Sequence, residues 1–313
     1  MAFALGCAAT IDDDDDPPIK PRTACDGPAE RTPLRLLTRA EYDNTIRDVL
    51  GLTSAPSKDF PREPLADGWD NDGALNQATD ESVTRYLEAA EALATEAVSS
   101  PDARLPPCPA RDVTCGPPLV NTVGRRLFRR PLLDDERNGL LALFNAALQS
   151  SSDVSVATEW TLAAMLQSPQ FLYRFEEGAA PAASSWRTPL DDFELASRLS
   201  YFLWASAPDD ALLDAAAAGA LSSPESLLAQ AQRLLSDPRG ATGKRRFFDL
   251  WLRLDDVPRL EKATLVYPAF TSALPGAWRT SLDLFIDDVL ANEGTLPALL
   301  TSNALYVNDT MSM

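Results

Sequence analysis

The chain has 313 residues, 45% of them apolar, and a formal net charge of −18 at pH 7. A chain of this length exceeds the usual size of one core, so two or three compact units are expected. Phosphate binding needs clustered Lys and Arg, and the 28 basic residues here mostly stand beside carboxylates. The composition therefore argues against a nucleic-acid partner.

The chain contains no histidine. This excludes Ser-His-Asp and Cys-His catalysis, histidine-ligated zinc, a proximal histidine for haem and the CxxCH attachment of c-type haem within these residues. We therefore expect no cofactor and no metal site in this chain. No catalytic constellation can be identified either, which leaves open whether the protein is an enzyme.

The first residues, MAFALGCAATIDDDDDPP, indicate an export signal. Leu5-Gly6-Cys7, followed by an acidic linker, resembles a bacterial lipobox, whose cysteine carries the lipid. Ala4 stands where leucine is commoner and no full apolar stretch precedes it, so an ordinary tail is the alternative. The sequence predicts a lipid anchor on Cys7 as the membrane contact, and an exported, cell-envelope protein. No later stretch approaches the ~18 consecutive apolar residues of a membrane span.

Helix signals dominate the rest of the chain. Thr38 and Glu41 have capping-box spacing, and Gly51 suits a C-terminal stop, which predicts a helix between them. Further helices are predicted over residues 81–98, 119–130, 134–148, 155–167, 188–203, 209–218, 224–236, 239–254 and 272–290. No alternating run is long enough to predict a strand. The fold class is therefore all-α.

Two cysteines lie seven residues apart in PPCPARDVTCGPP. A disulfide between Cys108 and Cys115 is expected in an oxidising compartment, whereas the spacing does not suit a metal pair. Cys25 is left over, either free or as a competing partner.

The loop GWDNDG, residues 68–73, has the composition of a ligand site. It fails the EF-hand pattern, because Gly68 and Thr79 would stand at carboxylate positions. An irregular calcium or ligand loop is one reading. We favour a turn in which Asx side chains bond the backbone and Trp69 anchors the loop.

Polar residues of the first helix and of this loop form the candidate site. Its members are Tyr42, Asn44, Arg47, Asp48, Trp69, Asp70, Asn71 and Asp72. The favoured interpretation is a buried hydrogen-bond network that holds the loop, and a ligand site is the alternative.

Two other charged patterns bear on chemistry. The four arginines of GRRLFRRP, residues 124–131, could hold an anion, but we expect them to pair with Asp134, Asp135 and Glu136. Adjacent acids recur along the chain, and glycoside hydrolysis needs only two carboxylates at a set separation. Most such acids are caps or solvated faces, and no catalytic pair can be named.

Three sets of motifs together resemble a known family. They are LRLLTRAEYDNTIRDVLG with GWDND; VGRRLFRRPLLDDE with AAMLQSPQFLYRFE; and LDDFELASRLSYFLWASAPDDALL with FFDLWLRL and SLDLFIDDVLANEGTLPALLTSNALYVND. In order they resemble the third, fifth and fourth planctomycete secreted domains of large exported proteins in planctomycetes and myxobacteria, over residues 33–309. Asp43 stands where the EYNNT form of the first motif has asparagine.

The resemblance implies a domain order but no reaction. We assign residues 1–29 to the signal and acidic linker, 30–100 to a first helical domain, 101–118 to a Cys/Pro linker, 119–178 to a second domain and 186–313 to a third. Relatives continue into two more domains, where sites resembling cytochrome c attachment occur. We expect this chain to be a truncated N-terminal portion, with any haem in a C-terminal part or on a redox partner.

Three hypotheses follow for function. The first is a lipoprotein whose helical domains form a scaffold or substrate-engaging part of a larger, redox-linked envelope protein. The second is a hydrolase of an envelope or extracellular polymer, which predicts an acid pair with a raised pKa in a cleft. The third is a fragment without function of its own, which predicts exposed apolar surface near residues 282–307.

Overall fold

The computed structural model describes residues 34–178, 189–292 and 294–311. The predicted lipidation site Cys7, the leftover Cys25 and the acidic linker lie outside the described residues. The described chain is predominantly helical, with one two-stranded sheet, which confirms the all-α prediction. It divides after Gly243 into two compact units, here called the large unit (up to Gly243) and the small unit (from Lys244).

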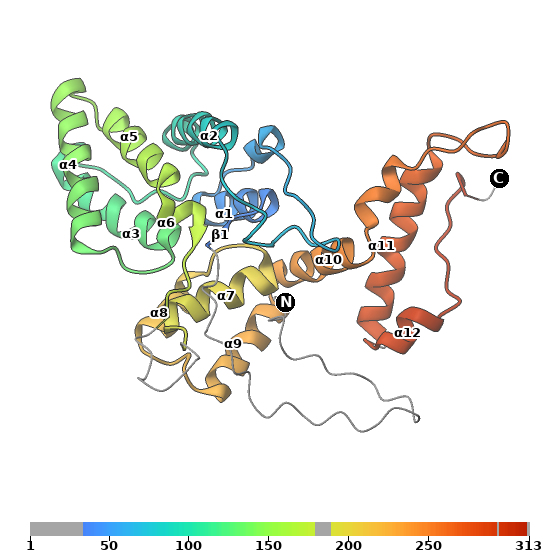
Figure 1. Cartoon of the computed structure of the whole chain (residues 1–313). Helices are drawn as coiled ribbons and strands as arrows, with labels where there is room; N and C mark the ends of the chain where they lie inside the picture. Colours follow the sequence, from blue (N-terminus) through green and yellow to red (C-terminus); the bar gives the residue numbers. More distant parts are fainter. Residues whose placement is uncertain (1–33, 179–188, 293, 312–313) are drawn as a thin grey trace. The chain divides into compact units, whose positions relative to one another are not determined.

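The elements follow one another as Figure 1 labels them, with η for a 3-10 helix. The large unit contains β1 (Arg35–Leu36), α1 (Arg39–Leu50), η1 (Pro56–Asp59), α2 (Asp80–Ser99), η2 (Val113–Cys115), α3 (Gly116–Phe128), α4 (Asp134–Ser151), α5 (Val154–Gln167), α6 (Pro169–Leu172), β2 (Tyr173–Arg174), α7 (Asp192–Trp204), α8 (Asp210–Ala217) and α9 (Pro224–Ser236). Helix α10 (Arg239–Trp251) spans the division, and the small unit continues with η3 (Leu254–Arg259), α11 (Leu274–Asn292) and α12 (Leu296–Thr301).

Helix α1 begins and ends where its sequence predicts. Thr38 accepts a hydrogen bond from the Glu41 backbone, and the Glu41 carboxylate accepts one from the Thr38 backbone at 2.9 Å. Gly51 closes the helix with φ of 75°, a left-handed conformation that glycine adopts without a Cβ clash. The capping box and the glycine stop are therefore confirmed.

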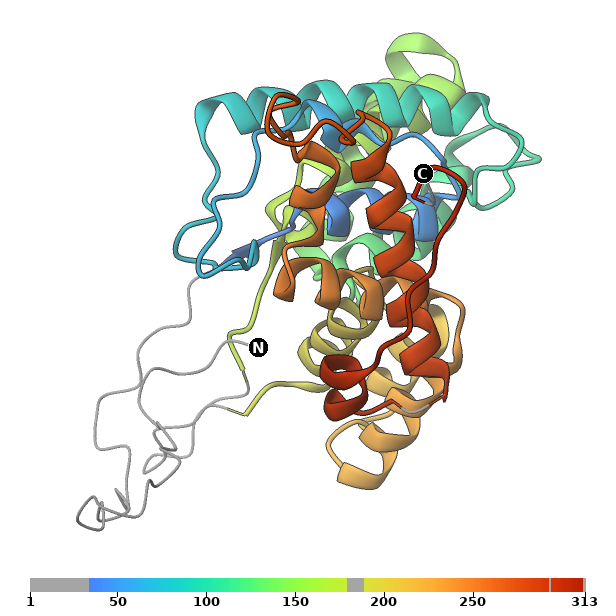
Figure 2. The ribbon, with the colours of Figure 1, turned by 90° about the vertical axis from the view of Figure 1, so that its right-hand side faces the viewer.

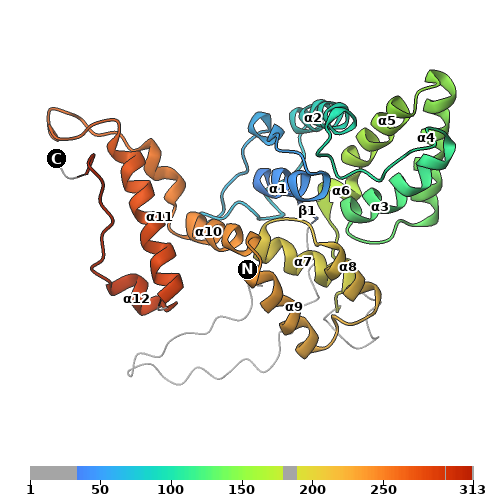
Figure 3. The ribbon, with the colours of Figure 1, turned by 180° about the vertical axis from the view of Figure 1, so that it is seen from behind.

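The main core of the large unit joins the first and second predicted helical domains. Ile46 of α1, Leu93 of α2, Leu127 of α3 and Leu162 of α5 are almost fully buried in one apolar cluster. Helix α5 packs against both α2 and α4, as Figures 1 and 3 show from opposite sides. The short strands β1 and β2 pair antiparallel, with Arg35 opposite Arg174, so the start of the first domain is fixed to the end of the second.

A second core lies around Trp204, at the end of α7. The indole is buried, and its Nε1 donates to the carbonyl of Leu234 on α9 at 2.7 Å. The guanidinium carbon of Arg239 lies 3.5 Å from the centroid of the indole ring. At Gly243 a Cβ would stand 1.9 Å from the Leu203 carbonyl oxygen, so only glycine lets α10 approach α7 this closely.

The segment before α7 is held by one carboxylate. Glu194 Oε1 accepts backbone hydrogen bonds from Glu177 at 2.7 Å and Gly178 at 2.9 Å. Its Oε2 accepts from the backbone of Asp191 at 2.9 Å, which completes a capping box on α7. The two flanks of residues 179–188 are thus fastened to the same side chain.

Cys108 and Cys115 are joined by a disulfide, with their Cα atoms 5.3 Å apart. Cys115 ends η2 and stands at the start of α3, so the bridge ties the proline-rich segment to the first turn of that helix.

The small unit is built on α11. The segment after α12 returns alongside α11, as Figure 2 shows. Between η3 and α11 the chain forms a loop over residues 260–273, whose tip extends past the first turn of α11 (Figures 1 and 3).

Candidate functional site

The structure places the predicted cluster residue Tyr42 in an aromatic core. Its ring centroid lies 5.0 Å from that of Phe60 and 5.3 Å from that of Phe171, both edge-on. Burial raises the pKa of Tyr42 well above its usual range, and its hydroxyl has no hydrogen-bond partner among the described residues. Tyr42 is therefore a packing residue and adds no hydrogen bond to the candidate cluster.

The other α1 members of the cluster connect helices. Asn44 Nδ2 donates to the carbonyl of Ala205, just after α7, at 3.2 Å. Arg47 donates to the Asn44 side chain at 2.6 Å and to Asp48 Oδ1 at 3.0 Å. Arg104 donates to the Asp48 carbonyl at 2.7 Å. These residues fix α1 to the end of α7 and to the chain after α2.

The loop members form a turn of their own. Ala66 and Trp69 exchange backbone hydrogen bonds of 2.8 Å. Asp70 is buried, whereas Asn71 and Asp72 are half-buried. Asp72 Oδ1 accepts from the backbone of Ala74 at 2.8 Å, which is the Asx turn expected from the sequence.

The segment that follows the loop is hydrogen-bonded to strand β1. Asn76 Nδ2 donates to the carbonyl of Leu36 on β1 at 3.4 Å. The hydrogen bonds described for Asn44, Arg47 and Asp48 run instead to α7 and to Arg104. The described hydrogen bonds of the helix members thus run to α7 and Arg104, and that of Asn76, just after the loop, runs to β1.

A buried polar network that the sequence did not reveal lies beside α1. Arg174 of β2 and Glu41 of α1 form an ion pair of 3.2 Å, and each side chain is only 8% exposed. Thr45 and Tyr201 share a hydrogen bond of 3.0 Å between their hydroxyl oxygens. The guanidinium carbon of Arg174 lies 5.1 Å from the centroid of the Tyr201 ring. The network joins α1 and β2 to α7.

Arg129 completes this network from the end of α3. Its terminal nitrogens donate to the carbonyls of Phe171 at 3.0 Å and of Gln170 and Tyr173 at 2.7 Å each. Burial lowers the pKa of Arg129. Because its donors are used by backbone carbonyls, Arg129 holds α6 and β2 in place and offers no anion site.

The expected pairing of the four arginines within their own segment is correct for one of them. Arg130 forms a two-bond ion pair with Glu136, at 2.8 and 2.7 Å, and the hydrogen bond lowers the pKa of Glu136. Arg125 and Arg126 instead reach α8, where they bind Asp214 at 2.6 Å and Asp210 at 2.9 and 2.5 Å. The prediction is therefore wrong for Arg125 and Arg126, which tertiary packing brings to α8. It is also wrong for Arg129, whose terminal nitrogens donate to backbone carbonyls.

The adjacent acids have structural tasks. Asp191 and Asp209 cap α7 and α8, as many such acids do. Asp209 also binds Arg233 through two hydrogen bonds of 2.8 and 3.0 Å, and Asp287 pairs with Arg245 at 2.6 Å. These carboxylates already serve as caps and ion-pair partners.

One acid of the small unit has a raised pKa. Burial, together with neighbouring Asp255 and Asp283, raises the pKa of Asp249. Arg279 binds Asp249 at 2.5 Å, Asp255 at 3.1 Å and Asp283 at 2.9 Å. Since one guanidinium holds the three carboxylates, this cluster does not provide the opposed acid pair that a glycosidase requires.

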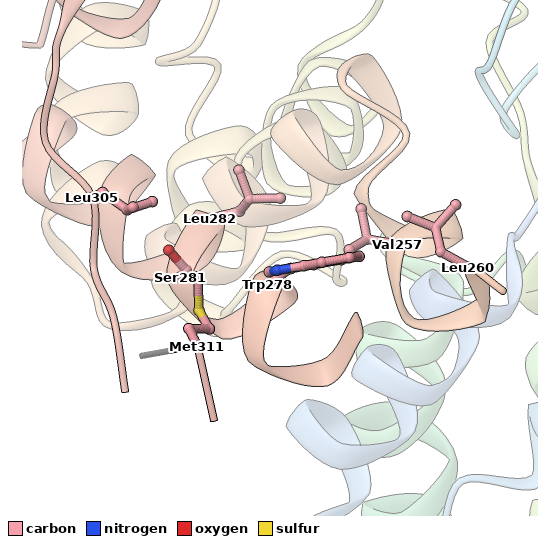
Figure 4. A pocket seen from close by; sticks show the side chains of 7 residues that line it. All are labelled: Val257, Leu260, Trp278, Ser281, Leu282, Leu305 and Met311. Carbon is pink, nitrogen blue, oxygen red and sulfur yellow. The ribbon is translucent and has the colours of Figure 1, made fainter. Parts of the chain in front are cut away.

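An apolar hollow of about 320 Å³ lies on the small unit (Figure 4). Its lining comprises Val257, Leu260, Trp278, Ser281, Leu282, Leu305 and Met311. Trp278 of α11 points toward Val257 of η3, and Leu305 and Met311 lie beside Ser281. A hollow of this size and composition suits an apolar side chain or small apolar molecule.

The small unit also carries large exposed apolar side chains between residues 284 and 307. We call them the apolar group of the small unit: Leu284, Leu296, Leu300, Leu305 and Val307. Leu300 is 67% exposed and Leu305, which also lines the hollow, is 69% exposed. This agrees with the exposed apolar surface expected near residues 282–307.

Three family models match successive parts of the chain. PSD3, a protein of unknown function (DUF1587), matches residues 35–99; PSD5 (DUF1595) matches residues 115–176; and PSD4 (DUF1592) matches residues 190–313. The chain belongs to the planctomycete secreted domain family. No curated protein and no solved structure matches it.

The family match gives the buried network a place in the domain order. Glu41 and Thr45 belong to PSD3, Arg129 and Arg174 to PSD5, and Tyr201 to PSD4. The network is therefore the point at which all three planctomycete secreted domains meet. Among the described residues no helix is long and apolar enough to cross a membrane.

Proposed function

We propose that this chain is a helical scaffold of an exported envelope protein, in which the large unit is a rigid support and the small unit docks another protein domain. The observation that carries the proposal is the contrast between the two units. The buried Arg174, Glu41 and Arg129 of the large unit are bound within it. In the small unit, Leu300 and Leu305 expose most of their surface, and Leu305 also lines an apolar hollow. Exposed apolar surface of this kind is typical of interaction sites.

The proposed envelope location rests on the lipobox-like Leu5-Gly6-Cys7 and on the resemblance to exported proteins. In this proposal the docked domain is a C-terminal domain or a redox partner, and that domain carries any haem. This chain has no histidine and no CxxCH sequence, so it supplies neither a proximal histidine nor a c-type attachment site for haem.

In-cell photocrosslinking tests the docking proposal. A benzophenone amino acid is placed at Leu300, and a matched one at Leu87, an exposed leucine of α2 in the large unit. We expect position 300 to crosslink to one defined protein or to a later segment of the same polypeptide, and position 87 to give no such product. Absence of any product at position 300 would overturn the proposal.

Cell fractionation tests the anchor. We expect the native protein to stay in the membrane fraction after a wash with alkaline carbonate and the Cys7→Ser variant to be released by it, with intact mass showing the lipid on the native chain. An unmodified mass at Cys7 would remove the lipoprotein part of the proposal without affecting the docking part.

A further inference from the structure

The loop between η3 and α11 exposes consecutive large apolar side chains at its tip. Leu265 is 95% exposed, Val266 67% and Tyr267 53%. Single exposed apolar residues are common on protein surfaces, but three in succession at the end of a loop are not. This tip is separate from the apolar group of the small unit, which lies on α11, α12 and the segment after α12.

The loop has a fixed backbone. Val266 and Tyr267 both donate backbone hydrogen bonds to the carbonyl of Ala263, at 3.0 and 2.9 Å, and Phe270 donates to the carbonyl of Tyr267 at 3.0 Å. The ring centroids of Phe270 and Trp278 lie 6.0 Å apart, and this contact connects the base of the loop to α11. The apolar tip is therefore presented in a defined conformation rather than exposed by loss of structure.

The charges around the tip favour an anionic surface. No Asp or Glu occurs in residues 262–282, in a chain whose formal charge is −18. Lys262 Nζ lies 5.6 Å from the centroid of the Tyr267 ring, and no ion pair engages this ammonium among the described residues. Glu261 precedes Lys262 at the start of the loop and is its one carboxylate, whereas the residues from the tip onward to Leu282 carry none. A cation that contacts the ring of Tyr267 at the apolar tip is complementary to lipid phosphate.

From the tip of the loop to its base, the side chains change from apolar to amphipathic to charged, as the environment does from the acyl chains of a bilayer to its headgroups. Aliphatic Leu265 and Val266 are the most exposed, Tyr267 follows with its polar hydroxyl, and Lys262 stands at the base. Tyr is enriched at the interface of a bilayer, where its ring is apolar and its hydroxyl is wet, and Lys reaches the headgroups with its apolar stem buried. A convex tip also enters a deformable lipid surface without needing a complementary cavity, which a protein partner would have to supply.

We infer that the tip of this loop, Leu265 to Tyr267, inserts into the interface of a phospholipid bilayer, with Lys262 contacting lipid phosphate. This membrane contact is additional to the proposed lipid on Cys7 and does not require it. It also does not depend on the docking of a protein at Leu300.

Vesicle sedimentation tests the inference on the full chain carrying Cys7→Ser, so that no lipid anchor contributes. The probes are vesicles of phosphatidylethanolamine and phosphatidylglycerol, and vesicles of phosphatidylcholine alone. We expect Leu265→Ser to weaken partition about tenfold and Lys262→Gln to weaken it about fivefold on the anionic vesicles only. The matched control Leu228→Ser, at an exposed leucine of α9 in the large unit, should leave partition unchanged.

Depth measurement gives an independent readout. With Cys25 also replaced by Ser, a nitrobenzoxadiazole probe on Leu265→Cys should shift to shorter wavelength on addition of vesicles and be quenched by lipids with a nitroxide on the acyl chain. Absence of binding by the Cys7→Ser chain, or equal losses for Leu265→Ser and Leu228→Ser, would overturn the inference. Unchanged melting curves by circular dichroism would show that the variants are folded, as expected for such exposed positions.

Discussion

At the residue scale, adding a single methyl group at Gly243 should strongly destabilise the fold. A Cβ there would collide with the Leu203 carbonyl at 1.9 Å, and backbone cannot move aside as a flexible side chain can. We expect Gly243→Ala to lower the free energy of unfolding by about 3 kcal/mol, through overpacking of α10 on α7. Urea unfolding followed by circular dichroism measures this.

Gly139 is the matched control for that substitution. It lies within α4, and nothing stands within 4 Å of the position its Cβ would take. Gly139→Ala should raise the free energy of unfolding by about 0.5–1 kcal/mol, because alanine restricts the unfolded chain and favours the helix. Equal effects of the two substitutions would contradict the close approach at Gly243.

Arg129 should matter far more than its neighbours in the same arginine-rich segment. Replacing it with methionine keeps an apolar stem but leaves the carbonyls of Gln170, Phe171 and Tyr173 without their donor. Buried acceptors without partners cost about 1–3 kcal/mol each, so we expect Arg129→Met to destabilise the large unit by about 4 kcal/mol.

The control is Arg125→Met, which removes a partly exposed ion pair with Asp214. Such pairs contribute at most about 1 kcal/mol. Thermal melting of both variants checks the contrast, and a similar loss in the two would mean that the carbonyl network of Arg129 is not important for stability.

At the scale of elements, the disulfide between Cys108 and Cys115 secures the entry to α3. Closing a ring across seven residues should stabilise the fold by about 2–3 kcal/mol in the chain-entropy model. We expect Cys108→Ser to lower the melting temperature and to make the remaining stability insensitive to dithiothreitol. If the native protein melts identically with and without dithiothreitol, the bridge is absent or makes no contribution.

The junction of α9 and α10 should respond to acid. Hydrogen bonds from the Arg239 side chain and backbone lower the pKa of Asp237 to about 2. An aspartate in an unfolded chain titrates near ~3.9, so this contribution is complete above about pH 4 and is lost as pH falls toward 2. Asp237→Asn should therefore flatten the fall in stability over that interval, as urea unfolding at successive pH values would show. An unchanged slope would contradict the assignment.

The elements also show what the sequence could and could not predict. Helix ends were predictable where a local signal exists, as at Thr38 and Gly51, because capping needs only residues close in sequence. The short helices α6 and α12 and the two-residue strands were missed, since they are too short to show periodicity. The partnership of Arg174 with Glu41 could not be predicted, because it links residues 133 positions apart that only the tertiary fold brings together.

The candidate cluster illustrates the same limit. Its residues were chosen as polar groups near one another in sequence, and the Asx turn at Asp72 was predictable on that basis. Tyr42 lies on the same face of α1 as the buried Ile46, Val49 and Leu50, so helical periodicity favours a core position for it over the polar cluster. The buried network of Arg129 and Tyr201 had no local signal, since its acceptors are backbone carbonyls.

At the scale of the whole molecule, net charge and exposed apolar surface have opposite effects on self-association. A formal charge of −18 keeps copies apart at low ionic strength, while Leu300 and its neighbours favour contact. Because salt screens the repulsion and leaves apolar attraction intact, we expect self-association to increase with sodium chloride in sedimentation velocity. Leu300→Ser should abolish that increase, and a wild-type protein that stays monomeric at all salt concentrations would contradict this reading.

The Glu194 carboxylate has a consequence for how the chain can be divided. It fastens Glu177 and Gly178 on one side and Asp191 on the other, so the ends of residues 179–188 stay together whatever connects them. Loop-closure entropy rises by only about 0.6 kcal/mol for each doubling of length. An affinity tag, a fluorescent domain or a protease cleavage site inserted there should leave the rest of the large unit intact. The two halves could then be produced as separate polypeptides that reassemble around one side chain.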